Sequence, residues 1–312
     1  MIKRIQNKIA ESRIALPVTA GYALLVWIAA GLISDGWWIQ LACAVLATYL
    51  MVEMNNQNAL IRIYSRMVSC SFLVLTCACN FLFHSMAAAL GGVCLSAFLL
   101  LLFRTYQDKA SPGGTFYAFL MVGLGSLVHV RILYLMPLFW LFMQFKIQSL
   151  SWRTFFASII GVLFPYWFIA PYCLWRNDFT ALLQHFEQLG WVTFPFDYRQ
   201  LTVNEVLFFT LLIVLTTVGT VHYARTRYKD KIRTRMLFDC FSIMSWVAIV
   251  LFALQPQHAT LLLPLLTACC SPLIAHFLAL THTRWTNMAF CLIVGAVLII
   301  TAVNLWIPSF HF

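Results

Sequence analysis

The chain has 312 residues, of which 62% are hydrophobic and 10% are charged, and its formal net charge is +10. A soluble domain carries about 25% charged residues, so this composition excludes a water-soluble globular protein. The positive charge does not indicate nucleic-acid binding, because the basic residues form short groups between apolar runs. Such a distribution is typical of a multi-pass membrane protein. We therefore predict an all-α transmembrane helix bundle that forms a single integral membrane domain (1–312).

The first apolar run, Pro17–Ile33, follows a basic N-terminal segment that contains Lys3, Arg4, Lys8 and Arg13. A basic segment before an apolar run also begins a secretory signal peptide. A run of about 17 residues, however, is long for a signal core and long enough to span a bilayer. We therefore predict a retained first span, with the N-terminus in the cytoplasm.

Further apolar runs, separated by short polar or basic loops, are interpreted as spans: Trp37–Met54, Met67–Phe83, Met86–Phe103, Thr154–Ala170, Val206–Val221, Met236–Leu254, Ala259–Leu280 and Met288–Ile307. In the loop after Met54, Arg62 or Arg66 is expected to form an ion pair with Glu53, which lies near the membrane interface.

The stretch Thr115–Phe145 is ambiguous, because it exceeds the roughly 20 residues that one span needs and is interrupted by His129 and Arg131. One tilted helix, two short spans and a re-entrant hairpin are all compatible with its length. Two spans place the six basic residues within Arg225–Arg235 in the cytoplasm, whereas one span places them outside.

The positive-inside rule favours two spans, and the predicted topology then has eleven spans, with the N-terminus inside and the C-terminus outside. We expect the protein in the cell inner membrane. Of the 20 Lys and Arg residues, this topology leaves three outside. They are Arg131, Arg176 and Arg199.

The one long segment of mixed charge is Pro171–Glu205, which the topology places on the extracytoplasmic side. Within it, Asp178–Leu189 has apolar residues three and four apart, so we predict an amphipathic helix capped by Asp178. His185 and Glu187 lie off the apolar stripe. Such a helix suits either a lid over a lipid-linked substrate or a packing element at the bilayer surface.

Several outer residues are candidates for chemistry. A guanidinium at Arg131, between two apolar runs, is costly unless it is paired or solvated, so it either snorkels to lipid headgroups or holds a phosphate or carboxylate. Asp35, just after the first span, is a candidate general base or an ordinary Ser-Asp-Gly turn residue. Asp197 and Arg199, among the aromatic residues of Trp191–Arg199, suit a sugar or lipid-phosphate headgroup or belong to an interfacial belt.

No motif for a soluble enzyme is present, and we expect neither a cofactor nor a bound metal. The ten cysteines lie almost entirely in apolar runs and lack the spacing of a zinc or redox site, so they are expected to act as small apolar side chains. The pair Gly123 and Gly125, inside an apolar run, predicts a close contact between helices.

Three segments, Asn55–Met67, Thr105–Leu127 and Leu150–Phe168, resemble a family of multi-pass inner-membrane proteins of bacteroidete bacteria. The resemblance covers most of the chain and implies a localisation and a helical fold, but no activity.

The many spans and the single long outer loop are also similar to polyprenol-dependent glycosyltransferases and to O-antigen polymerases and ligases. An acidic residue in the first outer loop, here Asp35, marks the former group. Outer arginines and a histidine in a large loop mark the latter, here Arg131, Arg176, Arg199 and His185.

This similarity implies an enzyme of envelope glycan assembly that uses a polyprenyl-phosphate-linked sugar at the outer face. The three arginines would hold the lipid phosphate, His185 would also bind the substrate, and Asp35 or Asp197 would act as the base. Two other functions remain open: a transporter or flippase, and a non-catalytic membrane subunit or assembly factor. The expected partners are membrane lipids, and no protein partner is predicted.

Overall fold

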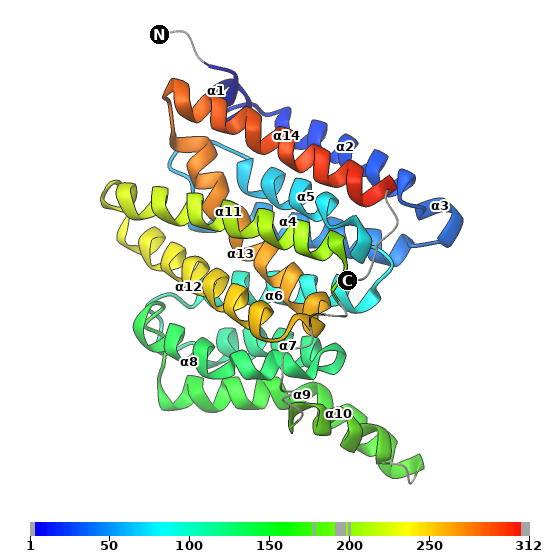
Figure 1. Ribbon diagram of the computed structural model, residues 1–312. Helices are drawn as coiled ribbons and strands as arrows, with labels where there is room; N and C mark the ends of the chain where they lie inside the picture. Colours follow the sequence, from blue (N-terminus) through cyan, green and yellow to red (C-terminus); the bar gives the residue numbers. More distant parts are fainter. Residues whose placement is uncertain (1–3, 177–178, 191–197, 199–200, 307–312) are drawn as a thin grey trace. The chain divides into compact units, whose positions relative to one another are not determined.

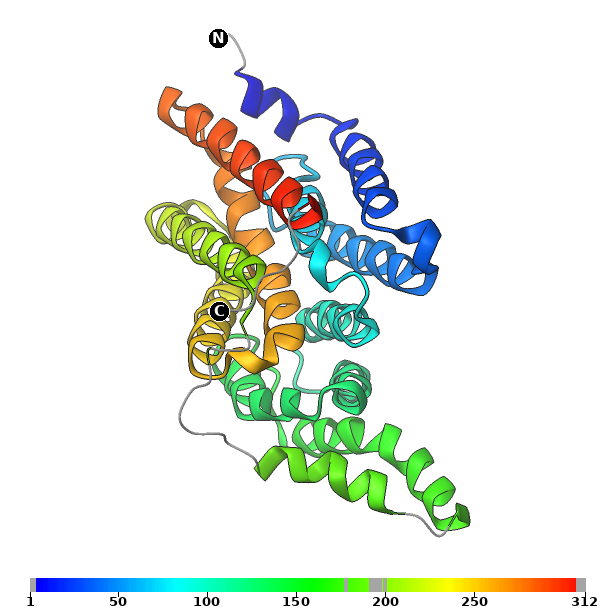
Figure 2. The same cartoon turned by 45° about the vertical axis from the view of Figure 1, so that its right-hand side comes forward.

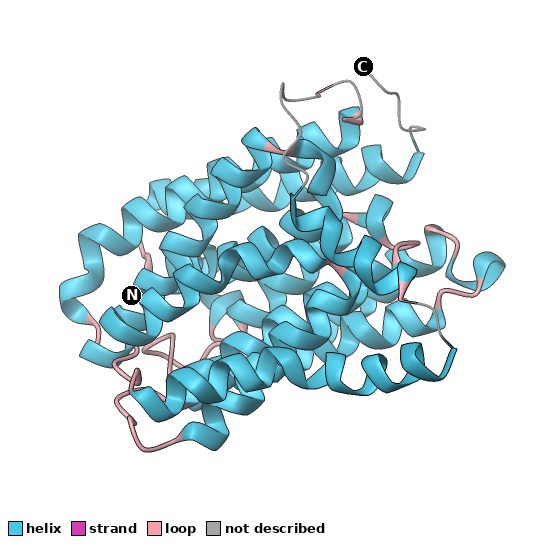
Figure 3. Cartoon of the chain, turned by 90° about the horizontal axis from the view of Figure 1, so that it is seen from below, coloured by secondary structure: helices cyan, strands magenta, loops and turns pink. Residues whose placement is uncertain are grey.

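The computed structural model describes residues 4–176, 179–190, 198 and 201–306, in which the regular secondary structure is helical (Figures 1 and 3). Within these residues, seven helices are long and apolar enough to cross a membrane: α4 (Trp38–Asn58), α6 (Met86–Arg104), α9 (Trp152–Arg176), α11 (Val203–Thr226), α12 (Ile232–Leu254), α13 (Ala259–Leu280) and α14 (Arg284–Trp306). Shorter apolar helices are α2 (Ala15–Ala29), α5 (Met67–Ala78), α7 (Pro112–Val128) and the pair η2 (Val130–Leu135) and α8 (Met136–Phe145). The predicted all-α class with membrane-spanning helices is confirmed at this level.

The chain divides into two compact units, each described by itself. Unit 1 comprises residues 1–89 and 197–312, and unit 2 comprises residues 90–196. Short helices complete them: α1 (Ile5–Ala10), α3 (Leu32–Asp35), η1 (Asn80–Leu82), η3 (Arg227–Lys229) and η4 (Pro256–His258) in unit 1, and α10 (Thr180–Gly190) in unit 2.

The centre of unit 1 is α13, whose side chains are almost all buried. It packs against α5, α11 and α12 (Figure 1). The closest approach is at Gly219 of α11, where a Cβ atom would lie 2.9 Å from the backbone carbon of Leu273. Only glycine permits this distance between the two backbones, which is how small residues bring helices together in a bilayer.

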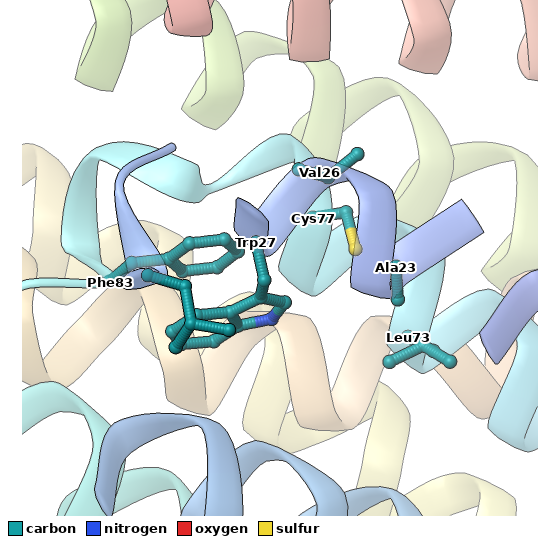
Figure 4. Packing of buried hydrophobic residues seen from close by; sticks show 7 residues of the cluster. Ala23, Val26, Trp27, Leu73, Cys77 and Phe83 are labelled. Carbon is teal, nitrogen blue, oxygen red and sulfur yellow. The ribbon is translucent and has the colours of Figure 1, made fainter. Parts of the chain in front are cut away.

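One end of α2 is held by an aromatic stack. The rings of Trp27 and Phe83 lie 3.7 Å apart and almost parallel, and Val26 and Cys77 are buried beside them (Figure 4). This contact joins α2 to the segment that follows α5. It therefore holds the first predicted span against the rest of unit 1.

Polar side chains join α14 to α5 and α2. Nδ2 of Asn80 donates to the carbonyl of Thr301 (3.0 Å), and Nδ2 of Asn304 donates to the carbonyl of Ala78 (2.8 Å). The Tyr22 hydroxyl lies 3.2 Å from Oγ1 of Thr301. Such hydrogen bonds between helices are favoured in an apolar solvent, because the same groups would otherwise lack partners there.

The ambiguous stretch of unit 2 forms two helical segments, so the alternative of a single helix is wrong. Helix α7 ends at His129, whose extended backbone (φ −132°, ψ 89°) interrupts the helical hydrogen bonds, and α8 begins only after η2. Pro137 lies in the first turn of α8, where its missing N–H is tolerated.

Helices α7 and α9 cross at two glycines, as predicted for Gly123. A Cβ atom on Gly123 would lie 2.6 Å from the carbonyl oxygen of Val162, and one on Gly161 would lie 2.7 Å from that of Phe116. Both carbonyls belong to helix backbone, which cannot move away as a flexible side chain can. The crossing therefore depends on the absence of a side chain at both positions.

We expect Gly161→Ala to destabilise the protein by about 1–3 kcal/mol, because the added methyl group has no room. The matched control is Gly295→Ala in α14, where a Cβ atom would meet nothing within 4 Å. That variant should gain up to about 1 kcal/mol from the higher helix propensity of alanine. Thermal unfolding in detergent measures both, and equal shifts of the same sign would contradict the close crossing.

Candidate functional site

The predicted base Asp35 lies in an exposed turn of unit 1. It is the last residue of α3, and its N–H donates to the carbonyl of Gly31 (2.9 Å). Gly31 and Gly36, on either side of α3, both have a left-handed backbone, which glycine adopts without strain. This geometry agrees with the interpretation of Asp35 as an ordinary turn residue. A catalytic role for Asp35 stays a prediction.

Arg131, in unit 2, caps the amphipathic helix α10. Its Nε donates to the carbonyl of Gln188 (3.3 Å), and the hydroxyl of Tyr134 donates to the carbonyl of Leu189. Both carbonyls lie in the last turn of α10, where they have no partner within the helix and the helix dipole is negative. Arg131 thus has a structural partner that neither predicted role anticipated.

The other predicted residue on α10, His185, points to the crossing of α7 and α9. Its Nε2 lies 2.9 Å from the carbonyl of Ser126 and 3.4 Å from the hydroxyl of Tyr166. The Tyr166 hydroxyl in turn lies 2.8 Å from Oγ of Ser126. Phe186 packs on the ring of Tyr166, with ring centres 5.1 Å apart.

Helix α10 is confirmed, close to its predicted bounds, and it runs beside α9 (Figure 2). The structure brings Arg131 and His185 together through this helix, and the contacts favour the packing element over the lid. Asp178, Asp197 and Arg199 lie outside the described residues, as does the side chain of Arg176, the last residue of α9.

A cluster of charged and imidazole side chains that was not among the predicted site residues lies in unit 1. The carboxylate of Asp230 is fully buried between Arg62 and His276. Its Oδ1 lies 3.1 Å from Nε of Arg62, and its Oδ2 lies 3.1 Å from Nε2 of His276. The ring of His222 lies 5.3 Å from that of His276. We call these four residues the Asp230 cluster.

The Asp230 cluster joins four parts of unit 1: the loop between α4 and α5, α11, the turn before α12, and α13. Arg235 extends the network, because its Nε donates to the backbone carbonyl of Asp230 (3.0 Å). Nη2 of Arg233 donates to Oδ1 of Asn58 at the end of α4 (2.8 Å). These contacts hold the end of α4 next to the start of α12.

An Asp–His pair is also the arrangement that orients a general base. Here the side chains of both Asp230 and His276 are fully buried, so no substrate atom reaches the imidazole. Removal of one partner of a buried, hydrogen-bonded ion pair strongly destabilises a protein, because the other charge is left buried and unpaired. The Asp230 cluster is therefore best described as a structural ion pair.

The expected ion pair of Glu53 with Arg62 or Arg66 is wrong. Glu53 accepts a hydrogen bond from Gln57, one helical turn later, and Arg66 donates to Oδ1 of Asn56. Arg62 pairs with Asp230, which is far away in the sequence. One signal in the sequence pointed to this cluster: a histidine at position 276 inside an apolar run, where ionisable residues have a specific partner.

An apolar cavity of about 440 Å³ lies in unit 1. Residues of α1, α2, α5, α11, α13 and α14 line it, and their exposed atoms are almost all apolar. The few polar side chains at its wall include Ser12, Thr19 and Tyr22. Its volume falls in the range of about 300–1,000 Å³ that is usual for small-molecule sites. We call it the apolar cavity.

Helix α1 lies beside the first turns of α14 (Figure 2). The buried Gln6 anchors it, with Nε2 donating to the carbonyl of Leu278 and to Oγ1 of Thr281, both at 2.7 Å. The backbone N–H of Gln6 donates to Oδ1 of Asn287 (3.1 Å). Ile9 of the same helix reaches the cavity wall.

Among the residues that the structure describes, no group of three or more His, Cys, Asp and Glu is placed to hold a metal ion. Comparison of the chain with protein-family models, with curated proteins and with solved structures gave no match. The fold and the apolar cavity are therefore the features that bear on the function of this protein.

The structural role of the Asp230 cluster predicts that Asp230→Ala destabilises the protein by about 2–4 kcal/mol. The loss of stability should be smaller than for a fully buried ion pair, because the Arg62 side chain is 35% exposed. The control is Asp108→Ala, which removes an exposed carboxylate that accepts only from a nearby backbone N–H. Thermal unfolding in detergent compares the two variants, and equally small effects would refute the structural role.

Proposed function

We propose that the chain is an inner-membrane protein of eleven spans, with the N-terminus inside and the C-terminus outside. Support for the count comes from the seven long and four shorter apolar helices, which overlap the predicted segments one for one. The orientation follows from the basic loops.

The contacts between helix ends support the same alternation. Arg4 donates to the carbonyl of His282, and Arg62 pairs with Asp230, so these basic and polar segments lie together. All of them are predicted on the cytoplasmic side. Helices α14 and α5 begin next to these segments. Near the other ends of the two helices, Asn304 of α14 contacts Ala78 of α5, and both residues are predicted near the outer side.

The function that the geometry favours is the binding of a lipid or lipid-linked substrate. The observation that carries this proposal is the apolar cavity, since a wall with few polar groups suits a hydrocarbon chain and not a hydrated solute. In the proposed topology, the first turns of α2, α5 and α14 face the cytoplasm. The chain of the lipid is then taken up from the inner half of the bilayer.

Within this proposal, the specific role is an enzyme of envelope glycan assembly that acts on a polyprenyl-phosphate-linked sugar. The resemblance implies action at the outer face, whereas a lipid in the cavity would present its headgroup at the cytoplasmic side, and the proposed enzyme acts on that side. The cavity would hold part of the polyprenyl chain. A flippase for the same class of lipid is the second candidate, because it also needs a site for the chain inside the helix bundle.

The topology predicts that an alkaline phosphatase fused after Tyr228 is inactive, since η3 faces the cytoplasm. A fusion after Glu187 in α10 should be active, since this enzyme requires the oxidising extracytoplasmic side for its disulfides. Enzyme activity, with immunoblots as the control for expression, distinguishes the two sites. Activity at Tyr228 would overturn the proposed orientation.

Filling the apolar cavity should reduce the lipid that remains bound to the purified protein. Ala15→Phe and Val294→Phe each place a ring at the cavity wall. The matched controls are Leu25→Phe and Leu292→Phe, on the same two helices but at exposed positions that do not line the cavity. Bound lipid is quantified by mass spectrometry after mild detergent purification. The proposal fails if the cavity variants and the controls retain the same amounts.

A further inference from the structure

We propose that two arginines at the cytoplasmic end of the apolar cavity, Arg13 and Arg66, bind the phosphate of an anionic lipid across the ring of Tyr64. This inference rests on the proposed function, because it assigns the headgroup of the lipid whose chain the cavity holds. We call Arg13 and Arg66 the arginine pair.

Both arginines are placed at the cavity by their neighbours in the chain. Ser12 and Ile14, which flank Arg13, line the cavity, and so does Met67, which follows Arg66. The Arg13 side chain is exposed, and that of Arg66 is half-buried. A headgroup next to the arginine pair is therefore joined directly to a chain inside the cavity.

The two guanidinium groups converge on one aromatic ring. The central carbon of Arg13 lies 6.0 Å from the centre of the Tyr64 ring, and that of Arg66 lies 5.6 Å from it. Each contact is a cation–π interaction by itself. Two like charges on one exposed ring repel each other, and an anion between them relieves this repulsion.

The remaining donors and charges of this region also suit a phosphate. One nitrogen of Arg66, Nη1, donates to Asn56, and the rest of its planar fork remains for a second acceptor. Arg66 immediately precedes α5, whose first N–H groups carry the positive end of the helix dipole. Residues 1–16 contain four basic side chains against one acidic side chain, Glu11.

The chain of the lipid cannot supply selectivity. A hydrocarbon chain in the bilayer is already in an apolar solvent, so entry into an apolar cavity gains little from the hydrophobic effect. Preference for one lipid over another must therefore come from the headgroup. Basic side chains near the membrane surface are the groups that distinguish anionic lipids from zwitterionic ones.

The test compares dioleoyl phosphatidylglycerol with dioleoyl phosphatidylcholine, which have the same chains and differ in net headgroup charge. The purified full-length protein is titrated with each lipid in detergent, and bound states are counted by native mass spectrometry. The wild type should bind the anionic lipid more tightly. Removal of each arginine, in R13Q and in R13Q/R66Q, should weaken that binding about fivefold per charge. Binding of the zwitterionic lipid should weaken less, because its quaternary ammonium group offsets the charge of its phosphate.

The control variant K109Q/R153Q removes two exposed basic residues of unit 2, one in the loop before α7 and one in the first turn of α9, that are predicted on the same side of the membrane. It should keep the preference of the wild type. R13K/R66K retains the charge but loses the guanidinium fork, so its affinity should lie between those of the wild type and R13Q/R66Q. Thermal unfolding of every variant identifies any loss of fold. The single variant R13Q also tests the site, because Arg13 is exposed and its replacement should leave the fold intact.

The inference is overturned if R13Q/R66Q keeps the preference for the anionic lipid, or if the control loses as much. It is also overturned if glycerol 3-phosphate, which has no chain, displaces the anionic lipid at equal concentration. The cavity variants Ala15→Phe and Val294→Phe separate this result from the proposed function. If they lose both lipids while the arginine variants keep their preference, the chain site stands and only the headgroup assignment fails.

Discussion

The structure of unit 1 depends on how α13 is enclosed. In a bilayer, apolar side chains gain little by leaving lipid, so helices associate where backbones approach closely and where polar groups find partners. Helix α13 has both kinds of contact. Gly219 of α11 lies against its backbone at Leu273, and His276, nearer its end, reaches the buried carboxylate of Asp230. The surrounding helices are positioned by these two contacts.

Close approach of helix backbones and hydrogen bonds between polar groups also occur elsewhere in the protein. In unit 2, glycines at the crossing of α7 and α9 bring the backbones together, and the hydroxyl groups of Ser126 and Tyr166 hydrogen-bond at the same crossing. In unit 1, amide side chains such as Gln6 and Asn80 donate to backbone carbonyls of other helices. Polar residues in the apolar segments are thus mainly employed in joining helices.

Because the polar residues near α10 join helices, the apolar cavity of unit 1 is a better candidate for a ligand site than the long loop of mixed charge. Arg131 and His185 hold α10 against the other helices of unit 2. In unit 1, the apolar cavity lies next to arginines that contact an exposed tyrosine ring. A cavity for a chain beside a site for an anion is the combination that a lipid ligand requires.

The sequence by itself determined the helical class, the apolar segments, the interruption at His129 and the amphipathic helix of the long loop. These are local properties, because hydropathy and periodicity are read along the chain. Only the tertiary structure decided the partner of Arg62, the burial of Asp230 against His276 and the cavity between α2, α5, α13 and α14. The physical reason is that pairing and enclosure depend on which helix faces meet, and nearly uniform apolar helices do not encode that choice in their periodicity.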